Sequence, residues 1–356
     1  RLFLNREGKL VDSTAASGLA GYRGWWNGLA GRDLDGDGDM DYVATNCGLN
    51  TKYHPSENHP VRLYYGTFGG HGRASIVEAK VFEDCLLPVR GKSCSQNAMP
   101  FVKKKFPTYH DFASATLKDI YSENSLREAN LFEVNYLESS VLINQGDGSF
   151  KLSVLPALAQ MAPCFGVVAT EVNGDGNADI YVVQNFYHPQ RETGKMAGGM
   201  SVLLLGDGSG SFEEVWPHKS GLVVPEDARG LSACDWNADG WVDFSVGVNN
   251  GKMKLYENQG KSQFSTRTLA IGLAGRPGNP TCVGAMVRLE LVNGSIQADE
   301  VRAGGSYISQ SSPELFFGLG EGEAVSSIKV RWPDGTQSEH QHAPGKTRMR
   351  IRQDEG

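Results

Sequence analysis

The sequence lacks the short motifs by which many enzymes and redox proteins are identified. It contains no GxSxG, no HExxH and, among its six cysteines, no CxxC. These absences exclude the common signatures of serine hydrolases, zinc proteases and thioredoxins. They favour a non-catalytic protein, although eight histidines and 41 acidic residues leave open a catalytic site that assembles only in three dimensions.

Long apolar runs and an excess of basic residues are also missing. No apolar run approaches the ~18 residues of a membrane-spanning helix, so we expect no membrane span in this segment. The net charge of −7 argues against a nucleic-acid-binding surface. The chain starts at Arg1 without an initiator methionine or a signal peptide. We therefore expect a piece of a longer protein whose targeting signal lies outside it.

Cysteine is sparse and glycine is abundant. Cys85 and Cys94 are close enough in sequence to form a disulfide within one loop, but free buried thiols are an equal alternative, so the cysteines do not indicate a compartment. The 44 glycines exceed the average share of ~7% and are typical of a β-rich protein with many turns.

A nine-residue acidic pattern occurs three times, at residues 33–41, 171–179 and 235–243. In each copy, side chains with oxygen atoms occupy positions 1, 3, 5 and 9, and glycine occupies position 6. Acidic side chains on alternate residues of a tight loop converge on one point, as the oxygen ligands of calcium must, and glycine permits the positive φ of the turn. Asp and Asn also favour turns without metal, but three copies with one spacing predict calcium binding.

The residues after each pattern exclude an EF-hand. An EF-hand needs a bidentate glutamate at position 12, where these copies have Ala44, Val182 and Val246. The β-branched and aromatic residues after position 9 predict short buried strands instead. Each acidic loop is therefore expected to join two strands.

A second repeated element precedes the acidic loops. An apolar strand, a Gly/Asp turn and a returning apolar residue predict β-hairpins at residues 2–10, 141–150, 202–212 and 254–264. The first three hairpins precede an acidic loop by 27 to 30 residues, and one unit spans about 60 residues. Repeats of this size with four short strands are typical of β-propeller blades.

The paired hairpin and acidic loop resemble the FG-GAP or VCBS repeat, the calcium-loop propeller blade of integrin α subunits and of many secreted bacterial proteins. The resemblance covers about residues 1–271, so we expect a propeller domain over residues 1–273. A complete propeller of this family has about seven blades. It implies an extracellular, secreted or periplasmic protein. It also implies structural calcium, because extracellular modules bind the ion only at ~10⁻⁴–10⁻³ M.

The same resemblance implies the calcium ligands. Side chains at positions 1, 3, 5 and 9 and the backbone carbonyl at position 7 would coordinate the ion, and four anionic ligands should make the first loop the strongest site. Glu171 departs from the usual aspartate and implies a weaker or differently coordinated second site. The implied ligands are Asp33, Asp35, Asp37, Asp39 and Asp41 in the first loop, Glu171, Asn173, Asp175, Asn177 and Asp179 in the second, and Asp235, Asn237, Asp239, Trp241 and Asp243 in the third.

Residues 61–77 look like a degenerate copy of the repeat. They align with a strand and an acidic loop, but Thr67, Gly69, His71 and Ser75 replace the ligands. Without a carboxylate this loop should not hold calcium. We interpret the segment as a blade that has lost its metal site.

Residues 80–140 show no blade pattern. Helical spacing at residues 111–121 and 125–132, with Ser125 as N-cap, predicts a partly helical insertion. Long ordered insertions often carry function. We therefore expect a specific partner site, if the protein has one, at this insertion.

A different pattern follows the linker at residues 274–280. Strand and turn signals from residue 283 to residue 335 are similar, in their order, to the ASPIC/UnbV module that closes proteins related to cartilage acidic protein. We expect a small β-sandwich-like domain over residues 281–353, packed against the propeller. Its motif residues Tyr307, Gln310 and Trp332 are expected to pack rather than to catalyse.

The sequence therefore predicts an all-β protein: a propeller of FG-GAP/VCBS-type blades with a partly helical insertion, followed by a small C-terminal domain. We favour a non-catalytic calcium-binding protein outside the cytoplasm that serves adhesion or binds a protein or carbohydrate ligand. The alternative is a glycan-active enzyme that uses the propeller funnel or the insertion. Carboxylates or histidines clustered in a pocket away from the three loops would favour the enzyme.

Overall fold

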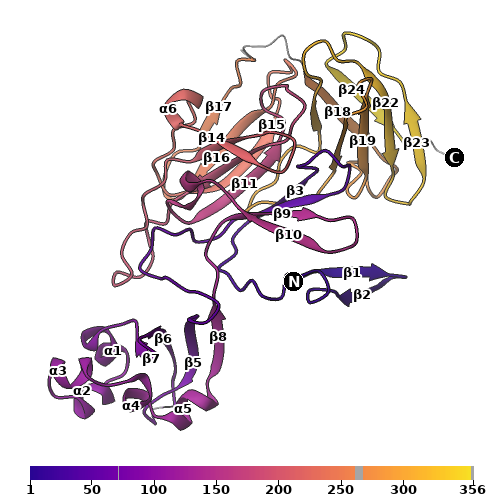
Figure 1. The fold of residues 1–356 in the computed structure, drawn as a ribbon. Coiled ribbons are helices and arrows are strands. Elements are labelled where there is room, and N and C mark those ends of the chain that lie inside the picture. Colours follow the sequence, from indigo (N-terminus) through magenta and orange to yellow (C-terminus); the bar gives the residue numbers. More distant parts are fainter. Residues whose placement is uncertain (71, 261–267, 354–356) are drawn as a thin grey trace.

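The computed structural model describes residues 1–70, 72–260 and 268–353, and it is predominantly β, with many small, mostly antiparallel sheets (Figure 1). A body of several sheets contains both the middle and the C-terminal part of the chain, and a smaller unit of strands and short helices projects from it. The described residues form no closed barrel and no closed ring of blades. None of the helices in this part of the chain has the length and apolarity that a bilayer crossing requires.

The second acidic pattern lies in a four-stranded antiparallel sheet with its strands in sequence order. The sheet consists of β11 (Cys164–Thr170), β12 (Asp179–Gln184), β13 (Val202–Gly206) and β14 (Phe212–Val215). The acidic loop joins β11 to β12, and β13 and β14 form a hairpin. The predicted strand–loop–strand unit and hairpin are confirmed here.

The third pattern lies in a sheet of the same order. It contains β15 (Ala228–Cys234), β16 (Asp243–Val248) and β17 (Lys254–Tyr256), and the acidic loop joins β15 to β16. The returning strand that the sequence predicts near residue 264 lies outside the described residues. Short helical segments, η1 (Ala157–Gln160) and α6 (Pro217–Ser220), lie in the connections on either side of the second sheet.

The first pattern lies in a sheet that is interrupted in sequence. Its strands are β3 (Leu29–Arg32), β4 (Asp41–Ala44), β9 (Ser140–Asn144) and β10 (Phe150–Val154), in the order β10-β9-β4-β3. The pairing of β4 with β9 brings Val43 opposite Val141. Residues 45–139 therefore leave the sheet and return to it at adjacent strands. The hairpin of β1 (Phe3–Arg6) and β2 (Lys9–Asp12), also predicted, forms a separate two-stranded sheet.

The second sheet is packed between the first and the third. Because successive side chains of a strand point to opposite faces, Ile180 and Val182 join a core with Val43 of the first sheet. Their neighbours Tyr181 and Val183 join a core on the other face, together with residues of the third sheet. Three consecutive repeats thus stack face to face.

The interrupting segment contains a sheet of its own in the order β7-β6-β5-β8. Its strands are β5 (Val61–Thr67), β6 (Ala74–Phe82), β7 (Cys85–Pro88) and β8 (Asn130–Val134). The interpretation of residues 61–77 as a degenerate blade is wrong, because β5 and β6 pair with β7 and β8 and not with the three stacked sheets, which we call the array. Of the residues proposed to replace ligands there, His71 lies outside the described residues.

Five short helices cover one face of this sheet. They are α1 (Lys92–Ala98), α2 (Phe101–Lys105), α3 (Tyr109–Ala113), α4 (Leu117–Tyr121) and α5 (Glu123–Glu128). The helix predicted over residues 111–121 is broken because Thr116 starts a new helix with a capping box to Asp119. Ser125 is not the N-cap; the hydroxyl of Ser122 accepts the N–H of Ser125 instead. We call residues 61–134 the inserted unit.

The C-terminal domain is a sandwich of two sheets around one core. The first sheet contains β18 (Thr268–Ala274), β21 (Leu315–Gly318) and β24 (Arg348–Arg352), and the second contains β19 (Met286–Leu291), β20 (Ile296–Glu300), β22 (Val325–Arg331) and β23 (Gln337–His340). Leu269, Phe317, Val287 and Ile328 from both sheets meet in the core, and Trp332 is buried among them. All six cysteines of the protein are free thiols.

Candidate functional site

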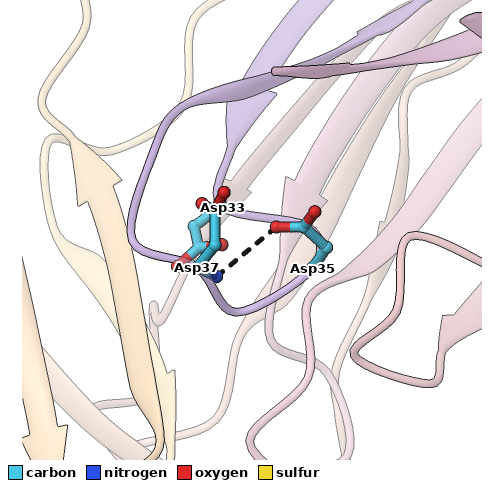
Figure 2. Close-up of side chains that lie close together, drawn as sticks. All are labelled: Asp33, Asp35 and Asp37. Atoms are coloured by element: carbon cyan, nitrogen blue, oxygen red, sulfur yellow. Dashed lines mark hydrogen bonds between the residues drawn. The ribbon is translucent and has the colours of Figure 1, made fainter. Parts of the chain in front are cut away.

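The first acidic loop brings three carboxylates together. One oxygen each from Asp33, Asp35 and Asp37 lies within 4.8 Å of the others, and Figure 2 shows the three side chains gathered at one turn of the loop. The loop bends through Gly36 and Gly38, whose φ angles of 77° and 91° are left-handed. This arrangement offers a hard cation several oxygen ligands at one point.

Burial makes the carboxylates of Asp33, Asp35 and Asp41 harder to ionise without a cation. It raises the pKa of Asp33 to about 6 and that of Asp41 to about 7, and neighbouring carboxylates add to both shifts. The pKa of Asp35 is raised for the same reasons. A bound cation would reverse these shifts, because it favours the charged form.

The three loops share one hydrogen-bond pattern. The carboxylate at position 1 accepts the N–H of the position-6 glycine in every loop, at 2.9–3.1 Å. The side chain at position 3 accepts the N–H of position 5, and the side chain at position 5 accepts the N–H of position 7. Asp39, Asn177 and Trp241 are the position-7 donors. The three sequence copies therefore fold into one loop conformation.

Glu171 fits the second loop in spite of its extra methylene group. Its side chain is fully buried, and its two oxygens accept the N–H groups of Asn173, Gly174 and Gly176. Burial and the neighbouring Asp175 raise its pKa to about 7. The longer side chain folds back into the loop and occupies the place where the other loops have aspartate.

The position-9 aspartates have a role that we did not predict. Asp41, Asp179 and Asp243 are fully buried. One oxygen of each accepts the N–H of position 2 of its loop, at 2.8–3.1 Å. The other accepts the N–H of Asn144, Gly206 or Asn258, which follow or end the third strand of the sheet. These carboxylates tie each loop to its own sheet. The aspartate that recurs at position 9 of every copy is the sequence feature that could have indicated this role.

All three loops face the C-terminal domain. Asp33 exchanges two hydrogen bonds with Ala298 of β20, one through its backbone N–H and one through its carboxylate. Gly320 donates its N–H to the carbonyl of Gly174 in the second loop. In the third loop, the carboxylate of Asp235 accepts a hydrogen bond from Arg348 of β24. We expected the C-terminal domain to pack against the preceding domain, but no sequence pattern indicates which residues meet, because the two sides are far apart in the chain.

A buried ion pair strengthens the contact beside the first loop. Arg32 lies 2.9 Å from Asp299, and it also donates a hydrogen bond to the carbonyl of Phe316. Both side chains of the pair are almost completely buried, and Arg302 makes a second ion pair with Asp299.

A cleft of about 930 Å³ lies between the inserted unit and the array, away from the acidic loops. Tyr65 and Ile76, which are opposite one another on β5 and β6, line one wall. Trp25 and Phe186 line the other. The ion pair of Glu78 and Arg90 also borders the cleft. The expectation that a partner site would involve the insertion points to this cleft.

Comparison with known protein families identifies the C-terminal domain. A family model described as ASPIC and UnbV matches residues 275–356, which confirms the predicted module at this end of the chain. No curated protein matches the sequence.

Proposed function

We propose that the chain is a non-catalytic, calcium-stabilised binding protein that works outside the cytoplasm. Calcium binds in the three acidic loops and holds them in shape. The observation that carries this proposal is the hydrogen-bond pattern shared by the loops, which points the side chains at positions 1, 3 and 5 into the same turn. The first loop, with three carboxylates already close together, is the strongest site.

The stacked sheets are, in this proposal, FG-GAP/VCBS-type blades of a β-propeller. Each has the acidic loop between its first two strands, and β11 of the second sheet lies next to both β3 and β15, the first strands of its neighbours. Such side-by-side first strands are the arrangement of neighbouring blades around a propeller axis. The ASPIC/UnbV domain covers the loop end of these blades.

The absence of catalysis is supported by the chemistry of the cleft. An enzyme that cleaves glycosidic bonds generally needs one carboxylate as an acid and another as a base or nucleophile. The two carboxylates in the cleft, Glu78 and Glu192, both lie beside the guanidinium of Arg90, at 2.9 and 3.7 Å. Tyr53 also donates a hydrogen bond to Glu78. Among the described lining residues there is no histidine.

Calorimetric titration of the metal-free protein with calcium tests the proposal. We expect three ions per chain and a higher melting temperature, since a calcium concentration about ten times the Kd stabilises the native state by about 1.4 kcal/mol per site. Asp37→Asn should remove one ion. The matched control is Asp39→Asn, two residues away in the same loop, whose side chain is not an expected ligand. A melting curve that EGTA leaves unchanged would refute the calcium sites.

A further inference from the structure

We propose that the cleft between the inserted unit and the array binds a neutral oligosaccharide. This inference rests on the proposed binding function and names its ligand class. Four observations support it: aromatic rings on both walls, rings already held in place, balanced charge, and polar side chains in the lining.

Aromatic side chains face the cleft from both sides. Tyr65, on the face of the inserted sheet opposite its helices, is 46% exposed. The facing wall contributes Trp25 and Phe186. A sugar ring presents apolar C–H groups on its faces and hydroxyl groups at its edge. It therefore buries its faces on such rings while its edge stays available for hydrogen bonds.

The rings of the array wall are fixed before a ligand arrives. Trp25 packs edge-on against Tyr53, with ring centroids 4.9 Å apart. Phe186 packs against Phe165, and the guanidinium of Arg229 lies over both rings. Binding would not have to order these side chains, which lowers the entropy lost on association.

The charged groups of the cleft balance one another. Its described lining contains two carboxylates, Glu78 and Glu192, and two guanidinium groups, Arg90 and Arg191. Arg90 is paired with both carboxylates. This balance favours a neutral ligand, because an anionic or cationic ligand would meet as many like charges as opposite ones.

Polar groups complete the match to a sugar. Amide and hydroxyl side chains that can donate and accept hydrogen bonds line the cleft: Asn27, Ser75, Asn97, Gln190 and Thr193. The volume of about 930 Å³ is near the upper end of small-molecule sites, which span about 300–1,000 Å³. A chain of several sugar rings therefore suits the cleft better than a single monosaccharide.

The test is calorimetric titration of the calcium-loaded protein with neutral hexasaccharides: β-1,4-glucan, β-1,3-glucan, α-1,4-glucan and β-1,4-xylan. Hyaluronan and alginate oligomers serve as anionic probes, and an unbiased peptide library serves as a protein-like probe. We expect at least one neutral hexasaccharide to bind. Tyr65→Ala should weaken its binding about tenfold or more, as loss of an anchoring aromatic ring does.

Phe82→Ala is the matched control. Phe82 is a similarly exposed aromatic residue, 56% exposed, on β6 of the same sheet, and it is not among the residues that line the cleft. This variant should bind as the unchanged protein does. Both side chains are exposed, so both variants should fold, which near-UV circular dichroism would check.

Several outcomes would overturn the inference: no binding of any neutral hexasaccharide, preference for the anionic probes, Tyr65-dependent binding of peptides only, or equal effects of the two substitutions. Saccharide binding and calcium stoichiometry are separate readouts, so a protein that binds three calcium ions but no saccharide contradicts only this inference. Saccharide that is bound and cleaved, as mass spectrometry would reveal, supports the site and contradicts the proposed absence of catalysis.

Discussion

Arg348 donates a hydrogen bond of 2.7 Å to Asp235, the position-1 carboxylate of the third acidic loop. A guanidinium of the C-terminal domain thus already neutralises a residue to which calcium would bind. The first loop differs, because the hydrogen bonds that Asp33 makes to that domain within the described residues go to the backbone of Ala298. The third loop should therefore bind calcium more weakly than the first.

Arg348→Gln should strengthen calcium binding at the third loop. An ion pair of about 1 kcal/mol that competes with the metal corresponds to about a fivefold change in Kd. Titration calorimetry would resolve this site from the other two. The control is Arg350→Gln, an exposed position on the same strand, which should leave all three affinities unchanged. An unchanged third Kd in Arg348→Gln would show that the arginine does not compete.

The stability of the metal-free protein should depend on pH through its buried loop carboxylates. The pKa of Asp33 is raised from 3.8 to about 6 and that of Asp41 from 3.8 to about 7, mainly by burial. Between pH 3.8 and about 7 the folded protein holds protons that the unfolded chain has released, so these groups lower the free energy of unfolding as pH rises.

Bound calcium keeps the same groups ionised and removes this decline. The difference in unfolding free energy between calcium-loaded and EGTA-treated protein should therefore grow from about pH 4 to about pH 7. Urea unfolding at several pH values would measure it. A difference that shrinks as pH rises would contradict the assignment of these carboxylates as ligands.

Arg32→Leu should strongly destabilise the protein. It leaves the buried carboxylate of Asp299 without its main partner, and such a loss typically costs about 3–5 kcal/mol. Because Arg302 still lies 3.1 Å from Asp299, we expect the lower end, about 3 kcal/mol. Arg302→Leu removes the more exposed partner of the same carboxylate and should cost no more than about 1 kcal/mol. Equal losses of unfolding free energy in urea would show that the buried pair has no special role.

Ala238→Gly should stabilise the third loop. Position 4 has a left-handed backbone in all three loops, with φ of 77° at Gly36, 78° at Gly174 and 62° at Ala238. A residue with a Cβ pays about 1–2 kcal/mol for this conformation, so the substitution should raise the unfolding free energy by about 1 kcal/mol. The reverse change, Gly36→Ala, should lower it by a similar amount, since an added Cβ there meets no crowding closer than 3.7 Å. A lower unfolding free energy in Ala238→Gly would show that the left-handed backbone at Ala238 is not strained.

The parts of the fold that were predicted correctly depend on short stretches of sequence. Each acidic loop and each hairpin is formed by neighbouring residues, so glycine positions and strand alternation are enough to locate them. The strand after Asp179 and the hairpin at Val202–Val215 are examples. Of the three motif residues expected to pack, Trp332 is buried, Tyr307 is partly buried and Gln310 is exposed.

The parts that were missed depend on contacts between distant residues. Residues 61–77 resemble a repeat locally, and only their pairing with β7 and β8 shows that they belong to the inserted unit. Arg32 of the first repeat pairs with Asp299 of the C-terminal domain, and Arg348 of that domain pairs with Asp235 of the third acidic loop, in each case across more than 100 residues of chain. Neither arginine stands in a motif, so the sequence offered no signal for either.

The pairing of Val43 with Val141 has a consequence for the order of folding. The first sheet can form only after the whole inserted unit has emerged and its ends have met, and closing a long loop carries an entropy loss that grows with its length. The second sheet joins strands that are close in sequence and avoids this loss. Contacts of short sequence separation form faster. The third sheet avoids this loss as well, so we expect the second and third repeats to form first and the first repeat to complete late by docking onto the second.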